Sequence, residues 1–328
     1  MALDVKVTIN LAKPVGRVGS WFPLLFVEGE AEKYAEYKSV DEVLAGGYTA
    51  ESDAYKAANL IFMQDNAPEK IAILTGTEEA LTETLAKYSN KGWRQLMLLG
   101  EFNQAVAEYV EGKGKMYFAH FATQEALTAA YAKIKEFDNT VCVLYTDDTV
   151  AYPEAAVIGA TAGLNAGSFT YKNMLIKGVP ALDMSDTEIE AVHANDGITI
   201  VEKAGDTVTS EGIVASGEYA DVIDSKDSII QKIAYYSQKV FNNNKKVPYT
   251  NNGIAMLEAA TLQALVEGYN DGMIAENDDG SPAYSTTFAL RSGTTEADRA
   301  SRNYPYGKFA FSLSGAIHKA EITGEITV

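Results

Sequence analysis

The chain has 328 residues, of which 47% are hydrophobic and 22% are charged, as is ordinary for a globular protein with one large or two modest domains. Its formal net charge of −18 argues against a nucleic-acid-binding surface as the main function. Cys142 is the only cysteine, so an intramolecular disulfide and a zinc site of several thiolates are excluded. It lies in an apolar run, where we expect a small buried side chain rather than a nucleophile.

The sequence shows no targeting or membrane segment. Its first ten residues, MALDVKVTIN, lack the basic and apolar regions of a secretory signal. The longest uninterrupted apolar run, Trp21–Val27, is too short to span a bilayer. We therefore expect no stable membrane insertion, and a protein that is made and used in the cytoplasm.

Residues Ala2–Ile9 alternate between apolar and polar side chains, which predicts a half-buried strand. Its apolar positions are Leu3, Val5, Val7 and Ile9. A stretch with proline and glycine follows, so the strand has no partner next to it in the sequence and must pair elsewhere. Two interpretations stay open: pairing inside its own domain, or an arm that adds a strand to a neighbouring subunit.

From Ser39 to Ala166 the sequence alternates predicted helices and apolar strands. One helix begins at a capping box of Ser39 and Glu42, and a second covers Ser52–Gln64. The strands are Lys70–Thr75, Arg94–Gly100, Lys115–Phe121 and Thr140–Thr146, with helices at Thr77–Lys91, Glu101–Glu111 and Thr123–Phe137. This order predicts an α/β fold with a mostly parallel sheet, flanking helices and right-handed crossovers.

A further helix is predicted over Ala151–Gly167. It carries a face of small residues with Gly159, Gly163 and Gly167, which predicts close packing against another element. We place a domain boundary directly after it, near Ala166–Ser168.

The block from Ser168 to Gly272 carries the clearest local signals. Ser185 begins a short helix that ends before Gly197, and Glu188 stands at the third position of a capping box. Gly205-Asp206 then separates two β-branched runs, which is the strongest hairpin signal in the chain. Two long helical patterns close the block, Val222–Asn242 and Asn251–Gly272, and a polar loop, Asn242–Lys246, joins them.

The C-terminal part begins with a polar loop at Glu276–Ser285. A strand is predicted at Thr286–Ser292 and a short helix or turn at Thr294–Arg302. From Tyr306 to Val328 the sequence alternates almost to its last residue, which predicts closing strands. Because chain ends normally fray, we expect something to hold this one.

A parallel α/β sheet invites an enzyme hypothesis, but the sequence contains no phosphate-binding loop. Two strands end in a single glycine, Gly76 or Gly100, and acidic residues that would repel a phosphate follow. Asp147 and Asp148 follow a strand end, where ligands bind in open α/β folds. They can bind a metal ion that in turn holds a phosphate, or they can stabilise a turn before the next helix.

Patterns of catalytic and metal-ligating residues were sought as well. The three histidines, His120, His193 and His318, have no His or Cys at metal-ligand spacing. No serine or cysteine lies in a nucleophile-elbow context, and Asn277–Gly280 lacks the alternating ligands of a calcium loop. We assign no catalytic residue, no metal site and no cofactor.

The order of elements after Ser168 is distinctive. It runs through Lys177-Gly178-Val179, a helix at Asp186–Ala194, Gly197–Val201, a charged hairpin at Gly205–Gly212, the two long helices, and Tyr306–Val328. This order resembles the C-terminal part of contractile tail sheath proteins, which surround the tail tube of myophages and R-type bacteriocins. The resemblance covers about half of the chain closely and the N-terminal half only in general style.

The resemblance implies four parts: an N-terminal β-arm (1–20), an α/β domain (21–167), a C-terminal α+β sheath core domain (168–305) and a C-terminal β-strand arm (306–328). Many sheath proteins carry large extra domains, so this chain is expected to be a short, minimal sheath. Whether residues 39–166 belong to the common core or decorate it stays open.

In sheath proteins the terminal arms cross to neighbouring subunits and complete a small β-sheet there. The residues that the resemblance assigns to this strand addition are Leu3, Val5, Val7, Ile9, Phe309, Phe311, Leu313, Ile317, Ile322, Ile326 and Val328. Sheath proteins also commonly grip the tube through basic residues near the C-terminus, which here are Arg291, Arg299 and Arg302. The alternative for these arginines is a solvated turn, and Asn242–Lys246 is interpreted as a surface loop.

The implied function is mechanical. Subunits would form a helical homopolymer around a tail tube protein, with baseplate and tail terminator proteins, and contract without nucleotide hydrolysis to drive the tube through a target envelope. The implied location is the host cytoplasm during assembly and then the virion tail or bacteriocin particle. Two alternatives stay open: an α/β nucleotide- or metabolite-binding enzyme with a site near Asp147, Gly76 or Gly100, and a different capsid or surface-layer subunit.

Overall fold

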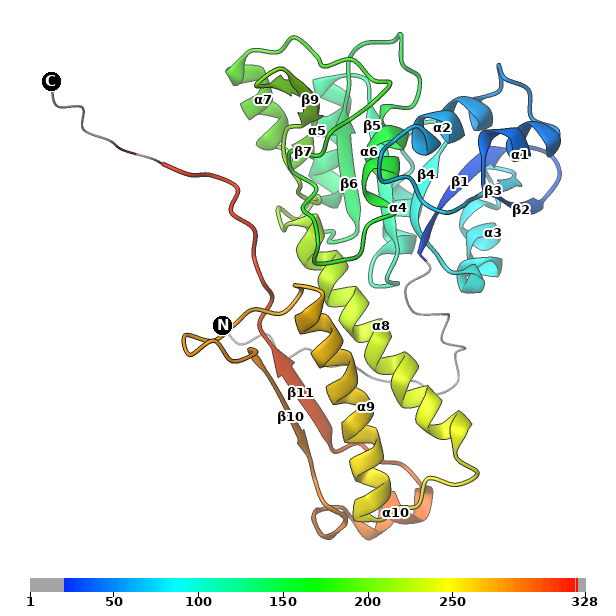
Figure 1. Ribbon diagram of the computed structural model, residues 1–328. Helices are drawn as coiled ribbons and strands as arrows, with labels where there is room; N and C mark the ends of the chain where they lie inside the picture. Colours follow the sequence, from blue (N-terminus) through cyan, green and yellow to red (C-terminus); the bar gives the residue numbers. More distant parts are fainter. Residues whose placement is uncertain (1–20, 322, 324–328) are drawn as a thin grey trace, which may run out of the picture.

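The computed structural model describes residues 21–321 and residue 323. The predicted N-terminal strand (Leu3, Val5, Val7, Ile9) and the predicted arm residues Ile322, Ile326 and Val328 lie outside the described residues. Figure 1 shows a sheet covered by helices, from which a long helical pair extends with a small sheet beside it. We call residues 21–219 the body and residues 220–313 the leg.

The body is built on a seven-stranded sheet in the order β2-β3-β1-β4-β5-β6-β7. The strands are β1 Phe22–Glu28, β2 Lys33–Tyr37, β3 Ile71–Gly76, β4 Trp93–Leu98, β5 Met116–Phe121, β6 Thr140–Leu144 and β7 Gly197–Ile198. Only the β2–β3 pair in this sheet is antiparallel. The predicted α/β class is confirmed, and the four predicted strands correspond to β3, β4, β5 and β6.

β1 was not predicted from the sequence, and it lies between β3 and β4 near the middle of the sheet. Its first five residues are buried, and both neighbouring strands run parallel to it. Strands buried on both faces read as continuous apolar runs rather than alternating ones, so FPLLFVE carries no period of two. β7 was not recognised as part of this sheet either, because it has only two residues.

Seven helices were expected in the body, and all seven form. They are α1 Val40–Ala45, α2 Asp53–Phe62, α3 Leu81–Lys87, α4 Gln104–Val110, α5 Gln124–Ile134, α6 Pro153–Thr161 and α7 Asp186–His193. The capping box at α7 is complete, since Ser185 accepts from the Glu188 backbone while the Glu188 side chain accepts from Ser185. The helix predicted over Thr77–Lys91 is shorter, because it ends at Lys87 and a 3-10 turn follows.

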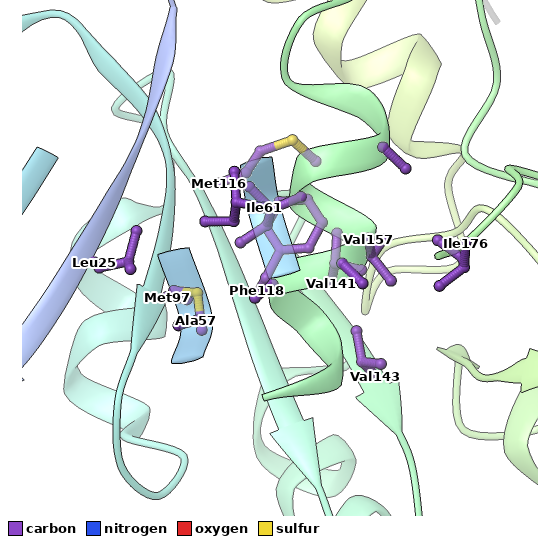
Figure 2. Packing of buried hydrophobic residues seen from close by; sticks show 14 of the residues in the cluster. Leu25, Ala57, Ile61, Met97, Met116, Phe118, Val141, Val143, Val157 and Ile176 are labelled. Carbon is purple, nitrogen blue, oxygen red and sulfur yellow. The ribbon is translucent and has the colours of Figure 1, made fainter. Parts of the chain in front are cut away.

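The body core has two layers, one on each face of the sheet. Leu25 of β1 belongs to one layer, whereas its neighbours Leu24 and Phe26 belong to the other, as the alternation of a strand requires. Figure 2 shows the first layer, in which side chains of the central strands such as Met97 and Phe118 meet residues of α2 and α6.

Close packing is confirmed at Gly159 in α6 and at Gly163, two residues after its end. A Cβ atom at Gly159 would lie 2.4 Å from the backbone oxygen of Ile61 in α2. A Cβ atom at Gly163 would lie 2.4 Å from the oxygen of Asn66, to which the Gly163 N–H donates at 3.0 Å. Only a residue without a side chain lets the two backbones approach this closely.

Residues 168–219 share the core of the α/β sheet and are part of the body. Tyr171, Ile176 and Val179 belong to the first core layer, and β7 pairs with β6. The predicted boundary near Ala166–Ser168 therefore does not coincide with a break in the packed core. The predicted hairpin is confirmed as β8, Ile200–Lys203, and β9, Asp206–Thr209, with positive φ angles of 54° at Ala204 and 90° at Gly205.

The leg consists of two long helices and a two-stranded antiparallel sheet (Figure 1). Its elements are α8 Ala220–Asn243, α9 Asn251–Asn270, β10 Tyr284–Phe288, α10 Glu296–Ser301 and β11 Gly307–Phe311. A separate apolar cluster joins α8 and α9 through Ile229, Ile233 and Leu265, and Phe309 and Phe311 of β11 pack against it. Both long helices and the strand before α10 were predicted within a few residues.

The contact at Gly159 yields a stability prediction. Gly159→Ala is expected to lower the free energy of unfolding by about 1–3 kcal/mol in urea titrations, because overpacking outweighs the gain in helix propensity. Gly100→Ala is the matched control, since a Cβ there meets no atom within 4 Å. Equal midpoints for the two variants would contradict the close-packing argument.

Candidate functional site

The carboxyl ends of the parallel strands were the expected place for an enzyme site. Glu28, Glu78, Glu79, Glu101 and Asp148 are exposed in the segments that follow or end these strands, and we call this surface the acidic edge. Its charge disfavours anionic ligands such as phosphates.

The side chains suggested for an enzyme have structural roles. The carboxylate of Asp147 accepts from the Thr149 backbone at 2.9 Å, which supports the turn interpretation. Burial raises the pKa of Cys142 to about 12, so its thiol is not activated as a nucleophile. Within residues 21–321, no group of three or more His, Cys, Asp or Glu side chains is arranged to hold a metal ion.

The joint between body and leg contains the charged side chain that is most completely buried among the described residues. Arg94 of β4 is fully buried, and its guanidinium contacts two carboxylates of α8. Nε and Nη2 donate to Asp224 at 3.1 and 2.7 Å, and Nη1 donates to Asp227 at 2.8 Å. Burial lowers the pKa of Arg94, but the two carboxylates more than compensate and raise it overall, so the side chain stays charged.

Two aromatic residues complete this joint. The Tyr171 hydroxyl donates to the second oxygen of Asp224 at 2.6 Å. Trp21 lies over the Arg94 guanidinium at 4.9 Å, and its indole N–H donates to Gln231 of α8 at 2.8 Å. Residues from β4, from the position directly before β1 and from the segment after α6 therefore hold the same face of α8.

The far end of the leg is basic, and it lies opposite the body in Figure 1. The three predicted tube-contact arginines are there: Arg291 in a 3-10 turn, Arg299 in α10 and Arg302 directly after it. The turn between α8 and α9 lies beside them, because Asn251 accepts from the Arg291 backbone at 2.9 Å and the Tyr249 hydroxyl donates to the Asn303 carbonyl at 3.0 Å.

This contact brings Lys245 and Lys246 to the same end, and Lys308 lies near the start of β11. We define the basic tip as Lys245, Lys246, Arg291, Arg299, Arg302 and Lys308. All six are exposed except Arg299, which is half-buried and donates to the oxygens of Thr294. None of the six forms an ion pair with a described residue. Asn242–Lys246 was interpreted as a surface loop from the sequence, because only the fold places it beside α10.

The predicted arm residues within the described ranges fall in two groups. Phe309 and Phe311 lie in β11, which pairs with β10 of the same chain, and Leu313 forms an isolated bridge with Ile274. The side chains of all three pack against the leg cluster, and Phe309 and Phe311 belong to the leg's own sheet. Ile317 lies beyond the leg and is 89% exposed.

Within the part of the chain that the structure describes, both outer edges of the β10–β11 sheet are free. Among the described strands, β10 pairs only with β11 and β11 pairs only with β10. An edge strand presents unpaired N–H and C=O groups that can accept a further strand. The leg therefore offers a place for strand addition at either side of this sheet.

Comparison with solved structures places the whole chain in one class of fold. A chain of the anti-feeding prophage baseplate aligns with 13% identity and a TM-score of 0.69, covering 100% of this chain and 99% of the other. The sheath complex of the extracellular contractile injection system PVC, in its contracted state, aligns with 12% identity, a TM-score of 0.70 and coverage of 100% and 97%. The sheath tail protein from Desulfitobacterium hafniense aligns with 11% identity, a TM-score of 0.62 and coverage of 94% and 99%.

The chain thus has the fold of sheath proteins of contractile injection systems, as its sequence resemblance implied. Because the alignments cover nearly all of both chains, residues 39–166 are part of the shared fold rather than a decoration. No protein-family model and no curated protein matches the sequence. Of the helices in the described ranges, none combines the length and apolar character needed to cross a membrane.

The joint yields a second prediction. Arg94→Met is expected to lower the free energy of unfolding by about 3–5 kcal/mol, because it leaves Asp224 buried without a counter-charge. Lys177→Met is the control, since the Lys177–Asp65 pair is exposed and such pairs contribute at most about 1 kcal/mol. Denaturant unfolding measures both, and a loss no larger than that of the control would show that the joint is not stabilised by this charge.

Proposed function

We propose that this chain is the structural subunit of a contractile sheath, which polymerises around a tail tube and contracts to drive the tube through a target envelope. The observation that carries the proposal is the alignment of the whole chain with chains from contracted sheath and baseplate assemblies. Its partners would be further copies of itself, a tube protein, and baseplate and tail terminator proteins. It would be found in the host cytoplasm during assembly and then in the tail or bacteriocin particle.

Strand addition at the leg sheet is the proposed link between subunits. The free edges of β10 and β11 can pair with extended arms, and the predicted arm residues Leu3–Ile9 have the alternation such a strand requires. Backbone hydrogen bonds are directional and do not depend on side-chain charge. A sheet link of this kind can therefore stay paired while the bodies rotate during contraction.

The basic tip is the proposed contact with the tube. It gathers six cationic side chains at the end of the leg in a chain whose net charge is −18. An acidic tube surface would attract it, and exposed charge pairs are individually weak and screened by salt. Such contacts can hold the extended sheath and release during contraction.

We infer that the subunit works without catalysis, and that the energy of contraction lies in the difference between two sets of subunit contacts. The alternative of a nucleotide- or metabolite-binding enzyme has no specific support here. Asp147 stabilises a turn, and the acidic edge occupies the place where a phosphate would bind.

Electron microscopy of the purified, overexpressed protein tests the polymer directly. We expect hollow tubes of uniform width, and we expect a variant that lacks residues 319–328 to form none while keeping the melting temperature of the unassembled subunit. The reason is that this truncation removes an arm but no part of the core clusters. Size-exclusion chromatography gives the control measurement of the folded, unassembled variant. Monomers of the intact chain at high concentration, with and without a tube protein, would contradict the proposal.

Charge removal at the basic tip tests the tube contact. The triple variant Lys245→Gln, Lys246→Gln, Arg302→Gln is expected to bind tube protein more weakly in co-sedimentation and to show a smaller dependence on salt, because it removes three of the six charges of the basic tip. A matched variant with Lys56→Gln, Lys113→Gln and Lys135→Gln removes the same charge from the body. Equal losses of tube binding in both variants would show that binding depends on the net charge of the chain and not on the basic tip.

A further inference from the structure

The C-terminal segment returns to the body after it leaves the leg. Its last backbone contact with the leg is the Ser314 N–H, which donates to the Met273 carbonyl at 2.9 Å. Gly315, Ala316 and Ile317 are exposed, and the extended chain in this region is drawn in red in Figure 1. The next side chain, His318, is only 10% exposed. His318 therefore holds the segment against the body, while the residues on either side of it are exposed.

Three body side chains surround the His318 imidazole. Nε2 lies 3.0 Å from the hydroxyl oxygen of Thr170, and the ring meets that of Tyr219 edge to face with 4.6 Å between centroids. Nδ1 lies 3.5 Å from a carboxylate oxygen of Glu211, which is an electrostatic contact rather than a well-formed hydrogen bond. We call these three residues the His318 socket.

The socket residues are themselves held in place by other contacts. Glu211 is held by Lys172, whose ammonium group donates to it at 2.6 Å, and both side chains are at least 85% buried. The Thr170 hydroxyl is within 3.5 Å of Asp221 in the first turn of α8. Its members come from the segment after α6, from the end of the β8–β9 hairpin and from the start of α8. The socket thus lies where body and leg join.

We propose that the His318 socket is a docking site for the chain's own C-terminal segment, and that it fixes the point from which the following residues leave the subunit. The docking itself stands on the contacts above, and its role for an arm rests on the proposed sheath function. Without the socket the segment would be free from Gly315 onward. Four more residues would then be mobile, and the reach of the segment would grow by about 13 Å.

Lys319, which is exposed and directly follows His318, provides a reporter for docking. A protease must draw residues on both sides of the cleaved bond out of the body, so trypsin cleavage after Lys319 measures how often the segment is released. In the intact, unassembled protein, His318→Ala is expected to raise the initial rate of this cleavage about tenfold, as loss of a buried polar contact of this size would. Mass spectrometry identifies the cleaved bond.

Ile317→Ala is the matched control, because this neighbouring side chain is exposed and its loss is expected to leave the rate unchanged. Tyr219→Ala is expected to raise the rate as well, and adding it to His318→Ala is expected to have little further effect, since His318→Ala already removes the contact with Tyr219. Equal rates for His318→Ala and Ile317→Ala, or fully additive effects of Tyr219→Ala and His318→Ala, would overturn the proposal. The readout needs no polymer, so failure to form tubes would count against the sheath function and leave the docking site standing.

Discussion

The shape of the molecule depends on one buried guanidinium. Arg94 lies at the amino end of β4, where desolvation makes an unpaired charge very costly, and Asp224 and Asp227 of α8 offset that cost. Both carboxylates are on one face of a helix that continues as the leg. A different angle between leg and body would separate these groups and leave a charge buried alone. The ion pair therefore selects one arrangement of the two parts, even where an apolar contact would be as stable.

This arrangement connects the two surfaces to which we assign function. The apolar cluster between α8 and α9 makes the leg stiff along its length, and the leg carries the sheet with free edges on its side and the basic tip at its end. A rotation of the body is therefore transmitted to both surfaces. The His318 socket adds a second connection, since it holds the C-terminal segment at the same joint.

Local signals in the sequence predicted most of the elements but not how they come together. Helix caps, the turn at Gly205 and the apolar strands of the α/β region depend on neighbouring residues, so they could be recognised directly. β1 was missed because a strand buried on both faces has no alternation, and β7 because two residues carry no pattern. Nothing local relates Arg94 to Asp224, which are 130 positions apart. For the same reason Lys245 and Lys246 joined the predicted arginines only in the folded chain.

The opposite charges at the two ends of the molecule limit how copies can be arranged. Two copies side by side in the same orientation place acidic edge against acidic edge and basic tip against basic tip, whereas two inverted copies pair opposite charges. Coulomb forces between isolated copies thus favour the inverted pair. A ring in which every tip points to a common axis needs a stronger and directional interaction to hold it, and an oppositely charged cylinder at that axis would remove the repulsion between tips. Parallel alignment of free copies therefore depends on directional contacts such as backbone strand pairing, and a template of opposite charge would make the same alignment more favourable.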